Sequence, residues 1–84
     1  MKKRYFVIFA GRERGVFDSF EACLAQVHRV KNCYRGYSKW EEVVDAVVRE
    51  MPDQGPFLFD VQGKRILFHT YERFRDYVMG VKYH

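Results

Sequence analysis

Residues 11–26 read GRERGVFDSFEACLAQ, and the fold of the first half of the chain follows from this stretch. Gly11 and Gly15 enclose a short basic segment and predict a turn, because glycine adopts the positive-φ conformations that turns require. Residues 16–17 predict a short strand, and the polar pair after them predicts an abrupt helix start with Phe20 in the first turn. A basic turn beside an aromatic ring favours contact with the phosphates and bases of nucleic acid.

The segments on either side predict a hairpin and a helix. Residues 5–9 (YFVIF) form a β-branched and aromatic run, which predicts a central strand that pairs antiparallel with residues 16–17. Asp18 with Glu21 predicts a capping box for the helix, and Ser19 is the alternative cap. The predicted buried stripe of this helix consists of Cys23, Leu24, Val27 and Val30.

A third strand and a second helix follow. Residues 34–37 (YRGY) predict a short extended segment, in which Gly36 suggests a bulge or a close approach by another backbone. Ser38 with Glu41 predicts a capping box for a helix that ends before Pro52. The apolar stripe of that helix, at helical spacing, is Trp40, Val43, Val44, Val47, Val48 and Met51.

The second half of the chain predicts another hairpin and a third helix. Residues 53–56 read as a linker, and residues 57–61 and 64–69 predict strands joined by a tight turn at residues 62–63. Thr70 predicts the cap of the third helix. The inward residues of this helix would be Tyr71, Phe74, Tyr77 and Val78, with Gly80 as its C-terminal stop.

Together these elements predict an α+β fold with a small antiparallel sheet. Residues 1–51 would form a three-stranded β-β-α-β-α core, and residues 52–84 a β-hairpin and helix extension packed on the same domain. Residues 17–21 (FDSFE) and 68–72 (FHTYE) each end a hairpin and open a helix, which suggests a structural pseudo-repeat. The chain of 84 residues is 48% hydrophobic and 18% aromatic, so a compact core without metal or disulfides is expected.

Positive charge is concentrated in the first half of the chain. Residues 1–40 hold nine Lys/Arg and three Asp/Glu, a net charge of +6, whereas residues 41–84 hold six and eight, a net charge of −2. A net charge of +4 is ordinary for a small domain. Its local concentration nevertheless favours an anionic partner for the first half.

The same residues argue against catalysis, cofactors and a membrane span. Cys23 and Cys33 match no metal spacing and are too few for a disulfide framework, and His28, His69 and His84 form no metal-binding pair. No nucleophile and base stand at a catalytic spacing, and the acidic residues near helix starts are explained by the helix dipole. No apolar run is long enough to span a bilayer. We therefore expect an intracellular protein that is not an enzyme and binds no cofactor.

The residues then resemble a known family, the N-terminal hybrid-binding domain of eukaryotic ribonucleases H, which also occurs in viroplasmin of plant pararetroviruses. The matching pattern is Phe6-Val-x-x-x-Gly11-Arg12-x-x-Gly15-Val16-Phe17-x-Ser19-Phe20-x-x-Cys23-x-x-Gln26-Val27, followed by Tyr34-Arg35-Gly36-Tyr37. The resemblance covers roughly residues 5–48. It implies a three-stranded sheet packed against two helices, which binds RNA/DNA hybrid, and double-stranded RNA more weakly, through the minor groove and phosphates.

The resemblance also implies roles for individual residues. Phe20 takes the place of a tryptophan that packs on deoxyribose, and Tyr34 matches the aromatic residue that partners it. Arg35 matches the first of two lysines that clamp DNA phosphates, and Arg12 matches the arginine of the Gly-Arg turn. Phe6 stands where the family often has a tyrosine near the DNA strand.

Further residues complete the expected site, and departures from the family pattern weaken it. Arg29 and the loop through Asn32 correspond to the segment that meets RNA 2′-hydroxyls, and Arg14 from the basic turn is a further expected phosphate contact. Phe20 offers a smaller surface than tryptophan, and Gly36 removes the second clamp lysine. A slightly shorter loop before residue 34 is a third departure. These changes would reduce hybrid selectivity more than they would damage the fold.

Two functions compete at this point. The first is a non-catalytic module that recognises RNA/DNA hybrid or double-stranded RNA through backbone and minor-groove contacts. The alternative is a protein–protein interaction or dimerisation module on the same scaffold, with residues 52–84 as the contact for a protein partner or a second copy. The loss of the second lysine at Gly36 and of the tryptophan at Phe20 favours the alternative, and the basic first half favours nucleic acid.

Overall fold

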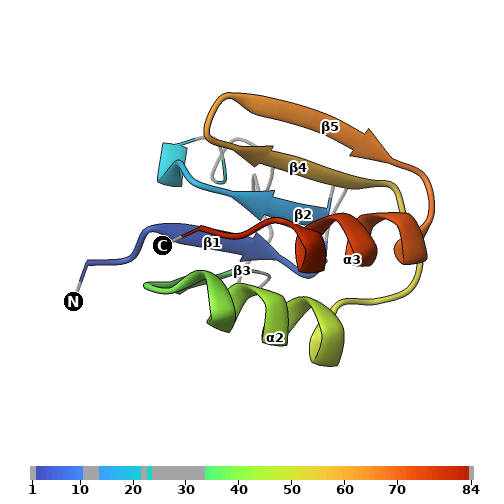
Figure 1. Ribbon diagram of the computed structural model, residues 1–84, viewed down its shortest axis with the longest axis horizontal. Helices are drawn as coiled ribbons and strands as arrows, with labels where there is room; N and C mark the ends of the chain where they lie inside the picture. The colour runs from blue at the N-terminus through green and yellow to red at the C-terminus, as the bar shows by residue number, and fades with distance from the viewer. Residues whose placement is uncertain (1, 11–13, 22, 24–33, 84) are drawn as a thin grey trace.

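The computed structural model describes residues 2–10, 14–21, 23 and 34–83, which form a mixed five-stranded sheet and two helices. The sheet order is β3-β1-β2-β4-β5 (Figure 1). The elements are β1 (Tyr5–Ile8), β2 (Arg14–Phe17), β3 (Tyr34–Tyr37), α2 (Trp40–Glu50), β4 (Phe57–Val61), β5 (Lys64–Phe68) and α3 (Tyr71–Gly80). The predicted α+β class is confirmed. The prediction of an antiparallel sheet is wrong, because the hairpin of the second half extends the sheet of the first and its strand β4 pairs parallel with β2. No helix of the described residues is long and apolar enough to cross a membrane.

The first three strands form an antiparallel unit around β1. Val7 of β1 lies opposite Val16 of β2 on one side and opposite Arg35 of β3 on the other. The predicted strand over residues 5–9 ends one residue earlier, at Ile8, and the predicted strand over residues 16–17 already begins at Arg14. Both faces of β1 are covered, since Val7 lies in the core beneath the helices and Ile8 in a second buried cluster with Phe17, which explains why the run is apolar on both faces.

A parallel pairing of β2 with β4 joins the two halves of the chain, with Gly15 opposite Leu58. A Cβ atom on Gly15 would overlap the carbonyl oxygen of Leu58 and lie 2.8 Å from its carbonyl carbon. The prediction that Gly15 serves a positive-φ turn is therefore wrong, because Gly15 lies inside β2 and allows the backbones of two strands to approach. Gly11, the other predicted turn glycine, lies outside the described residues.

Gly36 also differs from its prediction. A Cβ atom there would lie 3.0 Å from Lys3 Cγ and 3.3 Å from Phe6 Cε1, so side chains, and not another backbone, approach this glycine. The residue sits inside β3 opposite Phe6, in ordinary antiparallel pairing. The space beside Gly36 is therefore filled by the side chain of Lys3.

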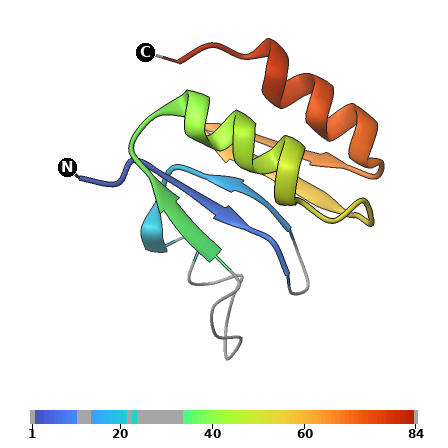
Figure 2. The same cartoon turned by 90° about the horizontal axis from the view of Figure 1, so that it is seen from below.

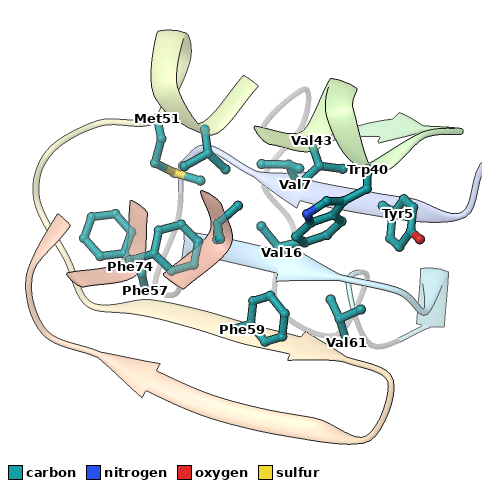
Figure 3. Packing of buried hydrophobic residues seen from close by; sticks show 12 residues of the cluster. Tyr5, Val7, Val16, Trp40, Val43, Met51, Phe57, Phe59, Val61 and Phe74 are labelled. Carbon is teal, nitrogen blue, oxygen red and sulfur yellow. The ribbon is translucent and has the colours of Figure 1, made fainter. Parts of the chain in front are cut away.

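Helices α2 and α3 cover one face of the sheet, which we call the helix face (Figure 2). Every second residue of each strand points into this layer, as the strand period requires. Figure 3 shows Trp40 and Val43 of α2 above Val7 and Val16, and Phe74 of α3 stacked on Phe57, with ring centroids 5.0 Å apart. The buried core of this face consists of Tyr5, Val7, Val16, Trp40, Val43, Val47, Met51, Phe57, Phe59, Val61, Phe74 and Val78.

The helix caps follow the sequence in part. The Thr70 hydroxyl accepts a hydrogen bond of 3.3 Å from the amide of Arg73, which confirms Thr70 as the cap of α3. The N-cap of α2 lies one residue later than predicted, at Lys39: the Glu42 carboxylate accepts a hydrogen bond of 3.1 Å from the amide of Lys39. The predicted pair of Ser38 and Glu41 is therefore wrong by one position, because α2 begins at Trp40.

The β4–β5 hairpin turns at Gln62 and Gly63, as predicted. Both residues have positive φ, 53° and 79°, as a two-residue turn of the primed type requires. The Asp18 carboxylate accepts a hydrogen bond of 2.7 Å from the amide of Gln62. Asp18, expected to cap its own helix, thus ties the start of that helix to the hairpin of the second half.

The face of the sheet opposite α2 and α3, here the opposite face, has its own buried cluster: Ile8, Phe17, Cys23 and Leu58. Phe20, Glu21 and Cys23 have helical backbone, and this segment lies across the sheet from α2 and α3 (Figure 2). The pseudo-repeat is therefore limited to local sequence, because the helix that starts at Phe20 and the helix that starts at Tyr71 lie on opposite faces.

Candidate nucleic-acid interface

Three aromatic side chains from three separate segments meet on the opposite face. The Phe6 and Phe20 ring centroids are 5.4 Å apart, and those of Phe20 and Tyr34 are 6.1 Å apart. We call these three residues the aromatic cluster. Phe6 and Tyr34 are partly buried against the cluster of Ile8 and its neighbours, whereas Phe20 is 46% exposed.

Strand register explains how the aromatic cluster forms. Successive side chains of a strand point to opposite faces, so Phe6 in β1 points away from the helix face on which Val7 is buried. Tyr34 in β3 pairs with Ile8, and its side chain lies on the same face as that of Phe6. The helical turn after β2 then brings Phe20 over the same strands. Half-exposed rings of this kind offer an apolar surface on which a sugar or a base can pack.

Arg35 lies on the other side of the sheet from the aromatic cluster. It pairs with Val7 in β3–β1 register, and its guanidinium Nη1 lies 2.9 Å and 3.1 Å from the two carboxylate oxygens of Glu50 in α2. The guanidinium carbon is also 5.7 Å from the centroid of the Phe9 ring. The predicted phosphate-binding residue is thus engaged by a carboxylate, and its contact with phosphate stays a prediction.

Two neighbouring groups have shifted pKa values. The Tyr37 hydroxyl and then the negative charge of Glu50 raise the pKa of Arg35 above its usual value. Burial raises the pKa of the Tyr37 hydroxyl. Both residues therefore keep their ordinary protonation states, cationic and neutral, around neutral pH, so Arg35 is a permanent cation of this edge of the sheet.

Arg14 is half-buried and bonded to backbone carbonyls. Its Nε donates a hydrogen bond of 3.1 Å to the carbonyl oxygen of Phe9, and its Nη1 donates another to the carbonyl oxygen of Gln54. Arg14 therefore fastens the segment before β4 to the end of β1, and a phosphate contact by this residue stays a prediction. The other predicted site residues, Arg12, Arg29 and Asn32, lie outside the described residues.

Lys3 is a residue of this face that the sequence did not single out. Its Cγ lies close to Gly36, beside the Phe6 ring, and the residue is exposed. Within the described part of the chain, Lys3 forms no ion pair. Strand alternation from Phe6 would place Lys2 and Arg4 on this face, and only the run of three basic residues could have pointed to Lys3.

The described residues contain no group of three or more His, Cys, Asp or Glu side chains that could hold a metal ion. This face carries the aromatic rings and Lys3, which forms no ion pair within the described residues, and Arg35 lies behind it, on the helix side of β3. Such groups act by stacking and by charge attraction, which are the means by which proteins hold a nucleic-acid backbone.

Comparison with known proteins identifies the family. The ribonuclease H1 N-terminal domain matches residues 4–47, which include the aromatic cluster and Arg35 but not Lys3, Glu50 or the unit from β4 to α3. No curated protein and no solved structure matches the chain. The matched domain is a non-catalytic binding domain, and its family indicates nucleic-acid binding. Because the match covers more than half of its residues, the chain belongs to the ribonuclease H1 N-terminal domain family.

Proposed function

We propose that this protein binds RNA/DNA hybrid or double-stranded RNA, without catalysis, through the opposite face of its sheet. The observation that carries this proposal is the aromatic cluster, in which rings from β1, β3 and the helical turn at Phe20 meet and stay partly exposed. A ring buried for core packing alone would not leave nearly half of its surface in water. The family adds support, because it indicates a nucleic-acid partner.

Phe20 and Tyr34 would pack on the sugars of one strand, and Lys3 would neutralise a phosphate beside Phe6. Cations that replace condensed counterions give most of the affinity of such complexes, and the affinity then falls as salt rises. Discrimination between strands comes from groove width and from contacts to 2′-hydroxyls. No base-edge readout is needed, so we expect little sequence specificity.

Arg35 lies on the helix side of the edge strand β3, so it could contact a phosphate at this edge only if it leaves Glu50. The pair is solvent-exposed, with 62% of the Arg35 side chain and 45% of the Glu50 side chain accessible. Exposed ion pairs of this type contribute little to stability because water and salt screen them. A phosphate can therefore replace the Glu50 carboxylate as the partner of Arg35 at a small cost in free energy.

The experiment that tests the proposal compares fluorescence-anisotropy titrations of matched RNA/DNA hybrid, double-stranded RNA and double-stranded DNA at several salt concentrations. We expect tighter binding to hybrid or double-stranded RNA than to DNA, and a clear loss of affinity as salt rises. In Lys3→Ala, the slope of log affinity against log salt should flatten by about 0.9, the value for one phosphate contact. Equal, weak binding to all three duplexes would refute the proposal.

A role of residues 52–84 in protein contact or dimerisation remains the alternative prediction. The observation that favours it is the exposure of two apolar side chains of this unit, Leu67 at 50% and Met79 at 53%. Sedimentation or sizing-column analysis of the pure protein tests it: a monomer at all accessible concentrations would count against a second copy as the occupant.

A further inference from the structure

A cavity of about 820 Å³ lies on the helix side of the sheet, away from the aromatic cluster. It forms where the N-terminal segment, the start of α2 and the C-terminal residues meet. Its volume is within the range of small-molecule sites, roughly 300–1,000 Å³. Its main lining residues are the aromatic side chains of Tyr5, Trp40 and Tyr83 and the cationic side chains of Lys2, Arg4 and Lys39.

The three aromatic rings pack against one another and form one side of the cavity. The ring centroids of Trp40 and Tyr83 are 4.8 Å apart, those of Tyr5 and Trp40 are 5.1 Å apart, and both pairs meet edge to face. Figure 3 shows the rings of Tyr5 and Trp40 side by side at the start of β1. The indole Nε1 of Trp40 donates a hydrogen bond of 2.9 Å to the carbonyl oxygen of Val81, which holds the C-terminal segment in place. The cavity is therefore built from packed residues at both ends of the chain.

The charge of the cavity is positive. Lys2, Arg4 and Lys39 form no ion pair within the described residues, and Glu41 is the one carboxylate in the lining. A ligand that matches this lining has an anionic group that pairs with the cationic side chains and a planar, largely apolar part that packs on the rings. A nucleotide has both, and base–aromatic stacking beside basic side chains is how proteins hold single strands. Tyr5 and Trp40 are 7% and 5% exposed, so the base would lie on Tyr83, the more exposed ring of the three.

One short basic segment contributes to both sites. Lys3 faces Gly36 and Phe6, whereas its neighbours Lys2 and Arg4 line the cavity. Positively charged side chains therefore lie on both sides of the sheet just before β1. A strand that leaves the aromatic cluster past Lys3 would be attracted towards Lys2 and Arg4 at the cavity.

We propose that this cavity binds one nucleotide of a single-stranded overhang that continues from the duplex held at the aromatic cluster. The identity of the ligand as part of the same nucleic acid rests on the proposed function. The cavity itself does not, and a nucleotide alone can be tested against it.

Trp40 makes this test direct, because it is the one tryptophan of the chain and lines the cavity. Its fluorescence, excited beyond the absorption of adenine, is titrated with adenosine 5′-monophosphate in the full chain. We expect a saturable change that Arg4→Ala and Lys39→Ala each weaken at least about fivefold, while Lys3→Ala leaves it unaltered. A missing or unsaturable response, or an equal response to inorganic phosphate or to polyglutamate, would overturn the proposal.

A second titration connects the cavity to the duplex. Hybrid with a single-stranded overhang should bind at least about fivefold tighter than the blunt hybrid, and Lys39→Ala should remove this gain without changing the affinity for the blunt duplex. An overhang that adds nothing would overturn the link between the two sites. If the blunt duplex binds but the nucleotide does not change Trp40 fluorescence, the nucleotide site is refuted and the proposed function stands. If the nucleotide changes Trp40 fluorescence but the duplex does not bind, the proposed function is refuted and the nucleotide site stands.

Discussion

Gly15→Ala should damage the junction between the two halves of the chain more than any exposed substitution. The pairing of β2 with β4 runs over four residue pairs, from Arg14–Phe57 to Phe17–Asp60. A methyl group on Gly15 would overlap the carbonyl oxygen of Leu58 and lie within 3 Å of its carbonyl carbon and amide nitrogen. These are backbone atoms of a central strand, so they cannot rotate away as the end of a flexible side chain would.

The expected loss follows from this geometry. Overpacking in a filled interior costs about 1–3 kcal/mol, and each ladder hydrogen bond that opens costs about 1 kcal/mol more. We therefore expect a loss of about 3 kcal/mol, against a total stability of about 4–13 kcal/mol for a chain of this size. At about 4–8 °C per kcal/mol, the thermal midpoint should fall by roughly 12–24 °C.

Thermal unfolding followed by far-UV circular dichroism measures this change, with Gly80→Ala as the matched control. Gly80 is the last residue of α3, and a Cβ atom there would meet nothing within 4 Å. Its replacement should leave stability unchanged or raise it by up to about 1 kcal/mol. A midpoint for Gly15→Ala within about 2 °C of the wild type would mean that β2 and β4 do not approach as described.

Three other substitutions separate stability from binding. Thr70→Ala removes the cap of α3 and should cost about 1 kcal/mol in urea unfolding; an unchanged midpoint would show that the cap contributes nothing. Arg14→Ala breaks two hydrogen bonds to carbonyl groups and should lower stability by about 1–3 kcal/mol while hybrid affinity holds; the opposite pattern would assign Arg14 to phosphate. Glu50→Gln frees Arg35 and should raise hybrid affinity with little change in stability, whereas Asp45→Asn, at another ion pair of the same helix, should not; equal affinities would leave Arg35 outside the site.

Much of the fold could be predicted from local patterns. The helical period of α2, Thr70 before α3, and the tight turn at Gln62 and Gly63 all depend on neighbouring residues, and all appear in the structure. Within the predicted stripe of α2, Val48 is an exception: it is exposed, and Ala46 is buried. The cap of α2 was misplaced by one position because Ser38 and Lys39 are both followed three residues later by glutamate. Serine is the better N-cap residue, so the sequence favoured Ser38. In the structure α2 begins at Trp40, which makes Lys39 the N-cap residue.

Long-range geometry could not be predicted in the same way. Only the parallel neighbour β4 explains why residue 15 is glycine, and nothing near Gly15 in the sequence indicates which strand lies beside it. The place of Arg35 likewise depends on strand parity and on Glu50, fifteen residues later. The position of Lys3 on the opposite face could not be predicted, because the chain before β1 departs from the alternation of side chains that a strand would have.

The aromatic cluster is the part of the site where sequence and structure agree most closely. The family pattern placed Phe6, Phe20 and Tyr34 in one site, and the structure places the Phe20 ring centroid 5.4 Å from that of Phe6 and 6.1 Å from that of Tyr34. Their role in binding stays a prediction. The cations around the rings differ from those predicted. Arg35 is held by Glu50 on the helix side of the sheet, and Lys3, from the N-terminal segment, lies beside Phe6.

The most direct test of this account is the hybrid affinity of Phe20→Ala beside that of Met79→Ala. The two side chains are similarly exposed, at 46% and 53%, but only Phe20 belongs to the aromatic cluster, and Met79 lies in α3 on the other side of the sheet. We expect Phe20→Ala to weaken binding about 5- to 100-fold with nearly unchanged stability, and Met79→Ala to bind as the wild type does. Equal affinities for the two variants, or a loss of stability alone in Phe20→Ala, would contradict the claim that the aromatic cluster is the nucleic-acid surface.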